Sequence, residues 1–201
     1  VTMAGGDAQA GGGLGWKQRG WAGLLLALLL GFFFREHLFD PETVLYGWDV
    51  VHEKYYWRSW GFGLLRQGTL PLWNPFVLCG FPFFADPIQG IFYPLNVAFW
   101  VLPVSLAFTW TLCLHLWLGA FFCFLFVERL TREPWSGLAS GVLFAFGGFM
   151  VGRIYLGSVP QLCTVAWLPC LFYLTERLFR EPRPGHGPLL ALAVAMQVLS
   201  G

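Results

Sequence analysis

The sequence predicts an all-α polytopic membrane protein, on the basis of its composition and its long apolar runs. Of the 201 residues, 57% are hydrophobic and only 11% are charged, whereas soluble domains have about 25% charged residues. A helix needs roughly 20 apolar residues to cross a bilayer, and several runs in this chain approach that length. The lipid bilayer is therefore the first expected partner, and the net charge of +1 gives no indication of nucleic acid.

Five membrane spans are predicted from the apolar runs. The first covers residues 20–38, because Lys17 and Arg19 precede an apolar run and no small-residue cleavage site follows it; a signal peptide is the alternative. The other spans are predicted over residues 104–127, 135–151, 162–179 and 188–201. Pro169 is expected to kink the fourth span. The fifth is incomplete, so we expect residues 20–201 to be the N-terminal part of one transmembrane domain in a longer protein, preceded by a disordered cytoplasmic N-terminus over residues 1–19.

Basic residues near the span ends predict which side of the membrane each connection occupies. With the N-terminus in the cytoplasm, seven of them lie inside: Lys17, Arg19, Arg129, Arg132, Arg177, Arg180 and Arg183. The remaining five lie outside, mostly within one long loop, where the positive-inside rule has little weight. Residues 39–103 are therefore predicted to form a long extracytoplasmic first loop.

This loop is predicted to contain an amphipathic helix over residues 53–67, of a kind that suits a membrane surface. Its expected apolar stripe consists of Trp57, Trp60, Leu64 and Leu65, and the basic residues expected off the stripe are Lys54, Arg58 and Arg66. Gly68 is predicted to be the helix C-cap. Five prolines between residues 71 and 94 exclude a long helix from the next stretch, and residues 92–102 are predicted to form a short interfacial helix.

The residues around Asp49 are the leading candidates for chemistry. Asp49 lies three residues before His52 and four before Glu53, so a helical start would place the three side chains on one face. Two carboxylates and an imidazole could hold a divalent cation such as Mg²⁺ or Mn²⁺, or share a proton. The alternative is that Asp49 is the N-cap of the following helix, with His52 and Glu53 in its first turn.

Other polar residues of the loop have structural alternatives to a site role. Asp86 precedes Pro87, and an Asp-Pro pair commonly begins a turn. Trp73 and Asn74 precede Pro75, and we expect them to be turn residues that could line a groove.

Polar and small residues within the predicted spans have packing roles as their first interpretation. His115 is expected to face the bundle interior as a hydrogen-bonded packing residue, with a proton relay as the alternative. Arg153 lies at the outer end of the third span, where it could meet a phosphate or extend to the membrane interface. The four-residue spacing of Gly137, Gly141 and Ala145 predicts close packing of helix backbones.

One block of the loop resembles the bacterial YfhO-type membrane protein family. In that family an early acidic residue and an amphipathic helix are followed by the pattern G-x-x-P-L-W-N-P, then G-x-P, A-D and F-Y-P-x-N. The matching block here begins at Gly68 and ends at Asn96, it includes Trp73 and Asp86, and Asp49 matches the early acid. The similarity covers about residues 20–201.

The resemblance implies a GT-C-like helical bundle, because the family is similar to the GT-C glycosyltransferases. Those enzymes transfer a sugar from a polyprenyl-phosphate donor, here to a cell-envelope glycan or protein acceptor outside the bacterial cytoplasmic (inner) membrane. By this resemblance Asp49 is the catalytic base or a metal ligand, and Glu53 or His52 assists it. Asp86 either supports these residues from behind or lies on the acceptor side. The residues expected to contact the substrates are Lys54, Arg58, Trp73, Asn74 and Arg153.

Two other functions remain open from the sequence. A transporter or flippase of a lipid-linked solute predicts interrupted or polar helices, for which Pro169 and His115 are the two indications. A non-catalytic membrane scaffold predicts that Asp49 can be replaced without loss of function, while Trp73 or Pro75 cannot.

Overall fold

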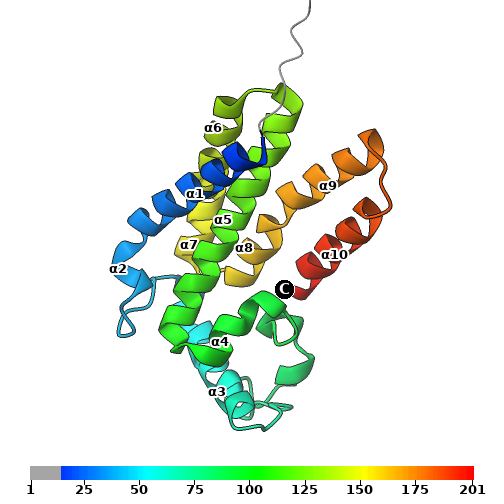
Figure 1. The fold of residues 1–201 in the computed structure, drawn as a ribbon. Helices are drawn as coiled ribbons and strands as arrows, with labels where there is room; N and C mark the ends of the chain where they lie inside the picture. Colours follow the sequence, from blue (N-terminus) through cyan, green and yellow to red (C-terminus); the bar gives the residue numbers. More distant parts are fainter. Residues whose placement is uncertain (1–14) are drawn as a thin grey trace, which may run out of the picture.

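The computed structural model describes residues 15–201, which form a helical bundle with a compact segment of short helices and loops at one end (Figure 1). In chain order the elements are α1 (Trp16–Phe33), α2 (Arg35–Leu38), the π-helix η1 (Val50–Lys54), α3 (Tyr55–Arg66), the 3₁₀ turns η2 (Phe83–Ala85), η3 (Pro87–Gln89) and η4 (Pro94–Val97), α4 (Ala98–Val101), α5 (Val104–Thr131), α6 (Pro134–Phe146), α7 (Gly148–Leu156), α8 (Val159–Ala166), α9 (Leu168–Arg180) and α10 (His186–Leu199). Within residues 15–201, β-structure is confined to one isolated bridge between Asn74 and Phe81. The predicted all-helical class is confirmed.

Within residues 15–201, three helices are long and apolar enough to cross a membrane. They are α5, the pair α6–α7 over Pro134–Leu156, and the pair α8–α9 over Val159–Arg180. They contain the spans predicted over residues 104–127, 135–151 and 162–179. The last pair is broken at Trp167, directly before Leu168 and Pro169, so the predicted kink is confirmed. The apolar helix α10 is shorter.

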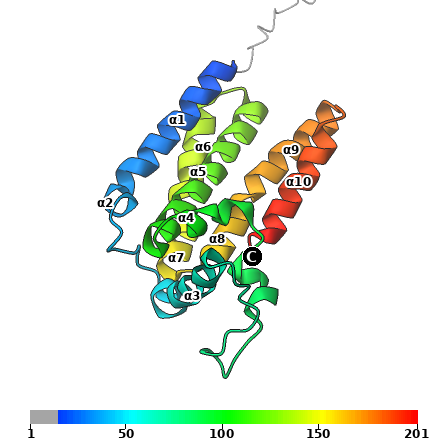
Figure 2. The same ribbon diagram turned by 60° about the horizontal axis from the view of Figure 1, so that its bottom comes forward.

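The helix α1 occupies the position of the predicted first span, but it is not one of these three. Its first turn carries Lys17 and Arg19, which reduce its apolar length, and it ends at Phe33. It lies along α5 (Figure 2), to which it is joined where Trp117 Nε1 donates a hydrogen bond to the Gly23 carbonyl at 2.9 Å. Its opposite face leaves leucines such as Leu28 exposed.

Small residues allow α6 to approach α5 closely, as the spacing of Gly137, Gly141 and Ala145 predicts. All three are buried. A Cβ atom on Gly141 would lie 2.7 Å from the Ala120 carbonyl oxygen, and one on Gly137 would lie 3.0 Å from the Phe124 carbonyl oxygen. Larger residues at these positions would therefore push the two helices apart.

Residues 39–103, here called the loop segment, are packed against the end of the bundle where α7 gives way to α8. A second hydrophobic core lies at this junction, formed by Val50, Phe62, Leu65, Phe99, Ala107, Phe108, Val159 and Cys163. One hydrogen bond fixes the start of the segment to α5, where Ser105 Oγ donates to the Pro41 carbonyl at 2.6 Å. A second fixes the end of α2 just before it, where Trp110 Nε1 donates to the Leu38 carbonyl at 3.0 Å. The segment is thus a folded platform against the bundle.

The predicted amphipathic helix forms, but a different face of it is buried. The buried residues of α3 are Arg58, Gly61, Phe62 and Leu65, whereas Trp57 and Trp60 of the predicted stripe are only half-buried. Gly61 is decisive, because the Phe83 ring lies directly over its Cα, where any side chain would collide. Gly68 does end the helix as predicted: it has φ +76°, its N–H bonds to the Leu65 carbonyl and the Thr69 N–H bonds to the Leu64 carbonyl.

The proline-rich stretch after α3 folds as successive 3₁₀ turns. Pro87 and Pro94 occupy the first position of η3 and η4, where a missing backbone N–H costs nothing. The predicted interfacial helix over residues 92–102 corresponds to η4 and α4. Arg66 fixes its end, since the guanidinium donates to the carbonyls of Phe99, at 2.7 Å, and Leu102.

Candidate functional site

The backbone around Asp49 is held against the α7–α8 junction by two glycines. A Cβ atom on Gly47 would lie 2.6 Å from Gly157 Cα, and a Cβ atom on Gly157 would lie 2.7 Å from Asp49 N and 2.6 Å from Val50 N. The two segments that contain Gly47 and Gly157 therefore touch through their backbones. Gly157 also has φ +75°, which only glycine adopts readily. Both requirements fix Asp49 at the end of α7.

The Asp49 carboxylate differs from most acids of the loop segment in having no partner. Within residues 15–201, Asp49 and Glu42 are the two acids of this segment whose carboxylates form no hydrogen bond or ion pair. Glu42 is exposed in a loop, whereas Asp49 is half-buried and lies in the first turn of a helix. Asp49 occupies the N-cap position of η1 with Glu53 in the first turn, as the alternative predicts, but its side chain accepts no capping hydrogen bond from the described residues.

A π-helical turn changes the arrangement predicted for His52. In η1 the Tyr55 N–H bonds to the Val50 carbonyl, five residues back. The wider turn moves residues three apart off a shared face. The His52 ring accordingly stacks on the Trp48 ring with centroids 4.3 Å apart, and its Nδ1 lies 2.8 Å from the Trp48 carbonyl oxygen. His52 therefore faces Trp48, and the π-helix replaces the predicted α-helical face.

The described residues do not supply a metal-binding cluster at this place. Among residues 15–201, no three His, Cys, Asp or Glu side chains come together as a group that could hold an ion. Because a carbonyl oxygen can only accept, His52 Nδ1 carries the proton and only Nε2 is left as a donor atom to a metal. Asp49 and His52, the predicted metal ligands, thus do not form a metal site without further ligands.

The three candidate cations occupy different environments. Lys54 lies 4.0 Å from the Glu53 carboxylate and over the Trp57 ring. Arg153 lies on α7, one residue before Ile154, whose carbonyl oxygen would be 2.8 Å from a Cβ on Gly47. The Arg153 guanidinium contacts the Phe149 ring and, within residues 15–201, forms no hydrogen bond or ion pair. Arg153 is therefore the free cation on the helix that carries the Asp49 segment.

Arg58 is buried, and the sequence expectation that it lies off the apolar face is wrong. Its side chain is sandwiched against the Phe99 and Phe108 rings, 4.7 and 5.4 Å from their centroids. Burial lowers the pKa of the Arg58 guanidinium to about 10. Its one hydrogen bond, to the Ile88 carbonyl, is 3.5 Å long, and Nη1 has no partner in the described part of the chain. In this conformation Arg58 is not accessible to a carrier phosphate.

Asp86 has the turn role that its place before Pro87 predicts. Its Oδ1 accepts from the Ile88 N–H at 3.1 Å, and its Oδ2 accepts from Gln89 Nε2 at 2.7 Å. Gln89 is fully buried, so the carboxylate fixes η3 to the core. Both carboxylate oxygens accept hydrogen bonds, which favours the turn role of Asp86 over a role in a site.

Trp73 and Asn74 also have structural contacts. The Asn74 side chain is buried, its Oδ1 accepts from the Phe76 N–H at 3.0 Å, and its backbone pairs with Phe81 through two hydrogen bonds. The Trp73 ring covers Gly80, where a Cβ atom would lie 2.5 Å from the indole Nε1. Asn74 thus closes the loop over residues 74–81, while the other face of Trp73 remains exposed.

The structure adds a buried polar network that the sequence indicated only through His115. The His115 Nδ1–H donates to the Thr111 carbonyl at 2.6 Å, so Nε2 accepts from the Tyr93 hydroxyl at 2.5 Å. Trp167 Nε1 in turn donates to the Tyr93 oxygen at 2.8 Å. The packing role expected for His115 is confirmed. Tyr93, which belongs to the F-Y-P-x-N block, joins the loop segment to α5 and to the α8–α9 break, and its burial raises the pKa of its hydroxyl.

Comparison with known proteins gives no relative from which a function could be transferred. No protein-family model matches the chain, and neither the curated proteins nor the solved structures include one that matches it.

Proposed function

We propose that this protein is a membrane glycosyltransferase of the GT-C type, which transfers a sugar from a polyprenyl-phosphate donor to a cell-envelope acceptor on the extracytoplasmic side. The loop segment is the part of the chain that would carry the reaction, at the outer surface of the bacterial inner membrane. The proposal takes its reaction class from the resemblance of the loop to the YfhO-type family. It takes its site from the geometry around Asp49.

The observation that carries the proposal is the state of the Asp49 carboxylate. It is half-buried, it has no partner within residues 15–201, and its backbone is fixed against α7 by the Gly47–Gly157 contact. An acid that served only the fold would be expected to pair, as Asp40 and Asp86 do. The adjacent π-helical turn is a further indication, because such turns are frequent at functional sites.

The chemistry requires one base and one cation. As the acceptor hydroxyl oxygen bonds to the anomeric carbon, Asp49 takes the hydroxyl proton. The bond from that carbon to the carrier phosphate breaks, and the phosphate leaves with the electron pair. Arg153, which is free of ion pairs within residues 15–201, would stabilise the negative charge that develops on the phosphate, and Lys54 is a second candidate for that role. No step of this proposal passes through a metal ion.

The test is an assay of sugar transfer from polyprenyl-phosphate donors by the protein in membrane vesicles. We expect Asp49→Asn to lower the rate at least 100-fold, because a general base contributes about 10² to 10⁴ in rate. Glu42→Gln is the matched control, since it removes the other unpaired acid of the segment, and it should retain activity. A chelator arm would show whether a divalent metal takes part.

Three results would contradict the proposal. Unchanged transfer by Asp49→Asn would remove Asp49 as the base. Equal loss in Asp49→Asn and Glu42→Gln would indicate a general charge effect. A well-folded wild-type protein that transfers no sugar from any polyprenyl-phosphate donor would refute the enzyme assignment and favour a transporter or a scaffold.

A further inference from the structure

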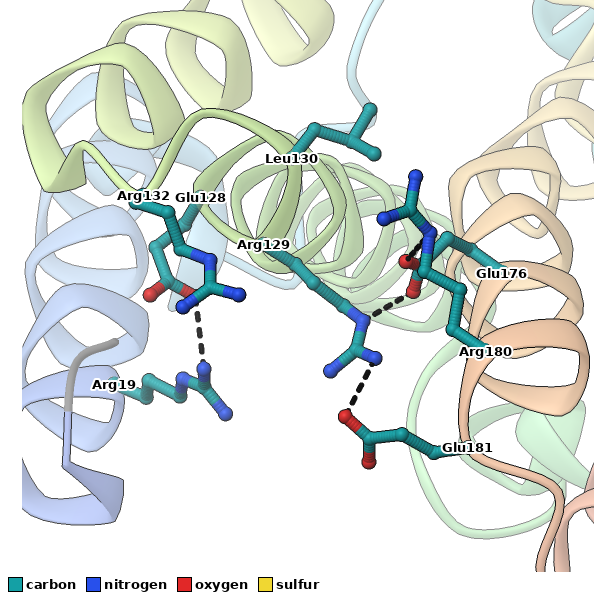
Figure 3. A pocket seen from close by; sticks show the side chains of 8 residues that line it. All are labelled: Arg19, Glu128, Arg129, Leu130, Arg132, Glu176, Arg180 and Glu181. Atoms are coloured by element: carbon teal, nitrogen blue, oxygen red, sulfur yellow. Dashed lines mark hydrogen bonds and ion pairs between the residues drawn. The ribbon is translucent and has the colours of Figure 1, made fainter. Parts of the chain in front are cut away.

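A polar pocket lies at the end of the bundle opposite the loop segment. It has a volume of about 470 Å³ and is lined by Arg19, Glu128, Arg129, Leu130, Arg132, Glu176, Arg180 and Glu181. The side chains come from the first turns of α1 and the last turns of α5 and α9, and they converge on one space (Figure 3). Residues from three separate parts of the chain thus build a single charged site.

The pocket contains more positive than negative charge, and its carboxylates are already paired. Arg19 bonds to the buried Glu128 at 3.0 Å. Arg129 bonds to both Glu176 and Glu181, and Arg180 bonds to Glu176 at 3.0 Å. The bond from Arg129 also lowers the pKa of the Glu181 carboxyl, which keeps that carboxyl ionised. Among residues 15–201, four arginines and three glutamates line the pocket, so this part of the lining has a net charge of +1.

Two arginines retain donors for a ligand. Within residues 15–201, the Arg132 guanidinium forms no hydrogen bond or ion pair, although it lines the pocket. Arg19 Nε is buried and has no hydrogen-bond partner among the same residues. Buried N–H groups without a partner are costly, and a ligand with acceptor oxygens would satisfy them.

Tryptophans place the pocket at the level of lipid headgroups. Trp16 and Trp21 on α1 and Trp135 at the start of α6 lie at this end of the bundle, and they are 79%, 68% and 79% exposed. Exposed tryptophans gather where a membrane meets water. α5 and α9 belong to helices long enough to span the bilayer, so their ends lie near that surface.

We infer that this pocket binds a phosphate group, with the headgroup of an anionic lipid as the source that its position favours. Arginine guanidinium groups bind phosphate oxygens through paired, charge-assisted hydrogen bonds. Arg132 and Arg19 would hold the phosphate, while the paired Arg129 and Arg180 would supply positive potential. The site is separate from the proposed transferase site, at the other end of the molecule, and does not depend on it.

The experiment measures the rise in thermal unfolding midpoint of the purified protein in an uncharged detergent, because a ligand that binds only the folded state raises it. The ligands are short-chain phosphatidylglycerol, short-chain phosphatidylcholine and inorganic phosphate, at equal ionic strength. The variant is Arg132→Gln, which breaks no ion pair among the residues that the structure describes. The control is Arg183→Gln, which removes the same charge from an exposed residue of the same end outside the pocket; it gives up a 4.0 Å ion pair with Glu181, whose carboxylate keeps its bond to Arg129.

We expect phosphatidylglycerol to raise the midpoint and Arg132→Gln to weaken its binding about tenfold, whereas Arg183→Gln leaves it nearly unchanged. Arg132→Lys keeps the charge but not the planar guanidinium, so it should lose less affinity for the lipid. It replaces Arg132→Gln in the experiment if that variant does not fold. Binding of the lipid alone identifies a headgroup site, and equal binding of inorganic phosphate identifies a site for free phosphate. No binding of either, or equal losses in the two variants, would overturn the inference.

Discussion

The backbone contact between Gly47 and Gly157 gives the sharpest prediction about the loop segment. Two effects hold the segment in place, a positive φ and a close backbone contact, and four glycines allow them to be tested separately. Gly157 has both a positive φ and a backbone within 3 Å of where a Cβ would lie, Gly47 has only the close backbone, Gly68 has only the positive φ, and the helical Gly152 has neither. Alanine at each position therefore tests strain and overlap separately.

The expected magnitudes follow from those two effects. A left-handed alanine costs about 1–2 kcal/mol, which applies to Gly68→Ala. Overpacking costs about 1–3 kcal/mol, which applies to Gly47→Ala. Gly157→Ala combines both and should lose about 2–5 kcal/mol. Gly152→Ala should gain up to about 1 kcal/mol, because alanine favours a helix interior over glycine.

Thermal unfolding in detergent, followed by tryptophan fluorescence, measures the series. A change of 1 kcal/mol shifts the midpoint by about 2–4 °C in a chain of this size, so the four variants should rank Gly152→Ala, Gly68→Ala, Gly47→Ala and Gly157→Ala from most to least stable. If Gly157→Ala were no less stable than Gly68→Ala, the segment carrying Asp49 would not be fixed against α7, and the proposed site would lose its support.

Two further substitutions test the junction of the loop segment with the bundle, with circular dichroism of thermal unfolding as the measurement. Tyr93→Phe leaves His115 Nε2 and Trp167 Nε1 buried without partners. Each unpaired buried group costs about 1–3 kcal/mol, so the variant should be strongly destabilised. An unchanged unfolding midpoint would contradict the network. Arg58→Met should leave stability unchanged or raise it, because it removes a buried charge with an unpaired nitrogen, whereas Arg66→Met should lower it by removing the bonds to two α4 carbonyls.

Local features of the fold were open to prediction because their causes lie close together in the chain. The predicted spans over residues 104–127, 135–151 and 162–179 correspond to apolar helices, and the kink near Pro169 and the cap at Gly68 follow from backbone chemistry at single residues. The turn role of Asp86 is equally local, since its partners are two and three residues away.

The features that were predicted wrongly, or not predicted at all, depend on residues far away in the chain. Arg58 was expected off the apolar face because arginine is polar, but the Phe99 and Phe108 rings, some 40 to 50 residues later, enclose it. No local pattern predicted the role of Tyr93, because its two hydrogen-bond partners come from other helices. The Phe83 ring lies over Gly61 and so determines which face of α3 is buried. No pattern within the helix could show this.

The sequence by itself determined that this protein is helical and that its long apolar helices suit a bilayer, because composition and local pattern act within one helix or one turn. Asp49 stays a candidate acid that rests on the resemblance of the loop to the YfhO-type family. Only the tertiary structure decided which acids are already paired, which cations are buried, and that Arg19, Arg132 and Arg180 meet in one pocket. The physical reason is that burial and pairing are set by contacts between segments. Such contacts follow from packing in three dimensions and not from the order of residues along the chain.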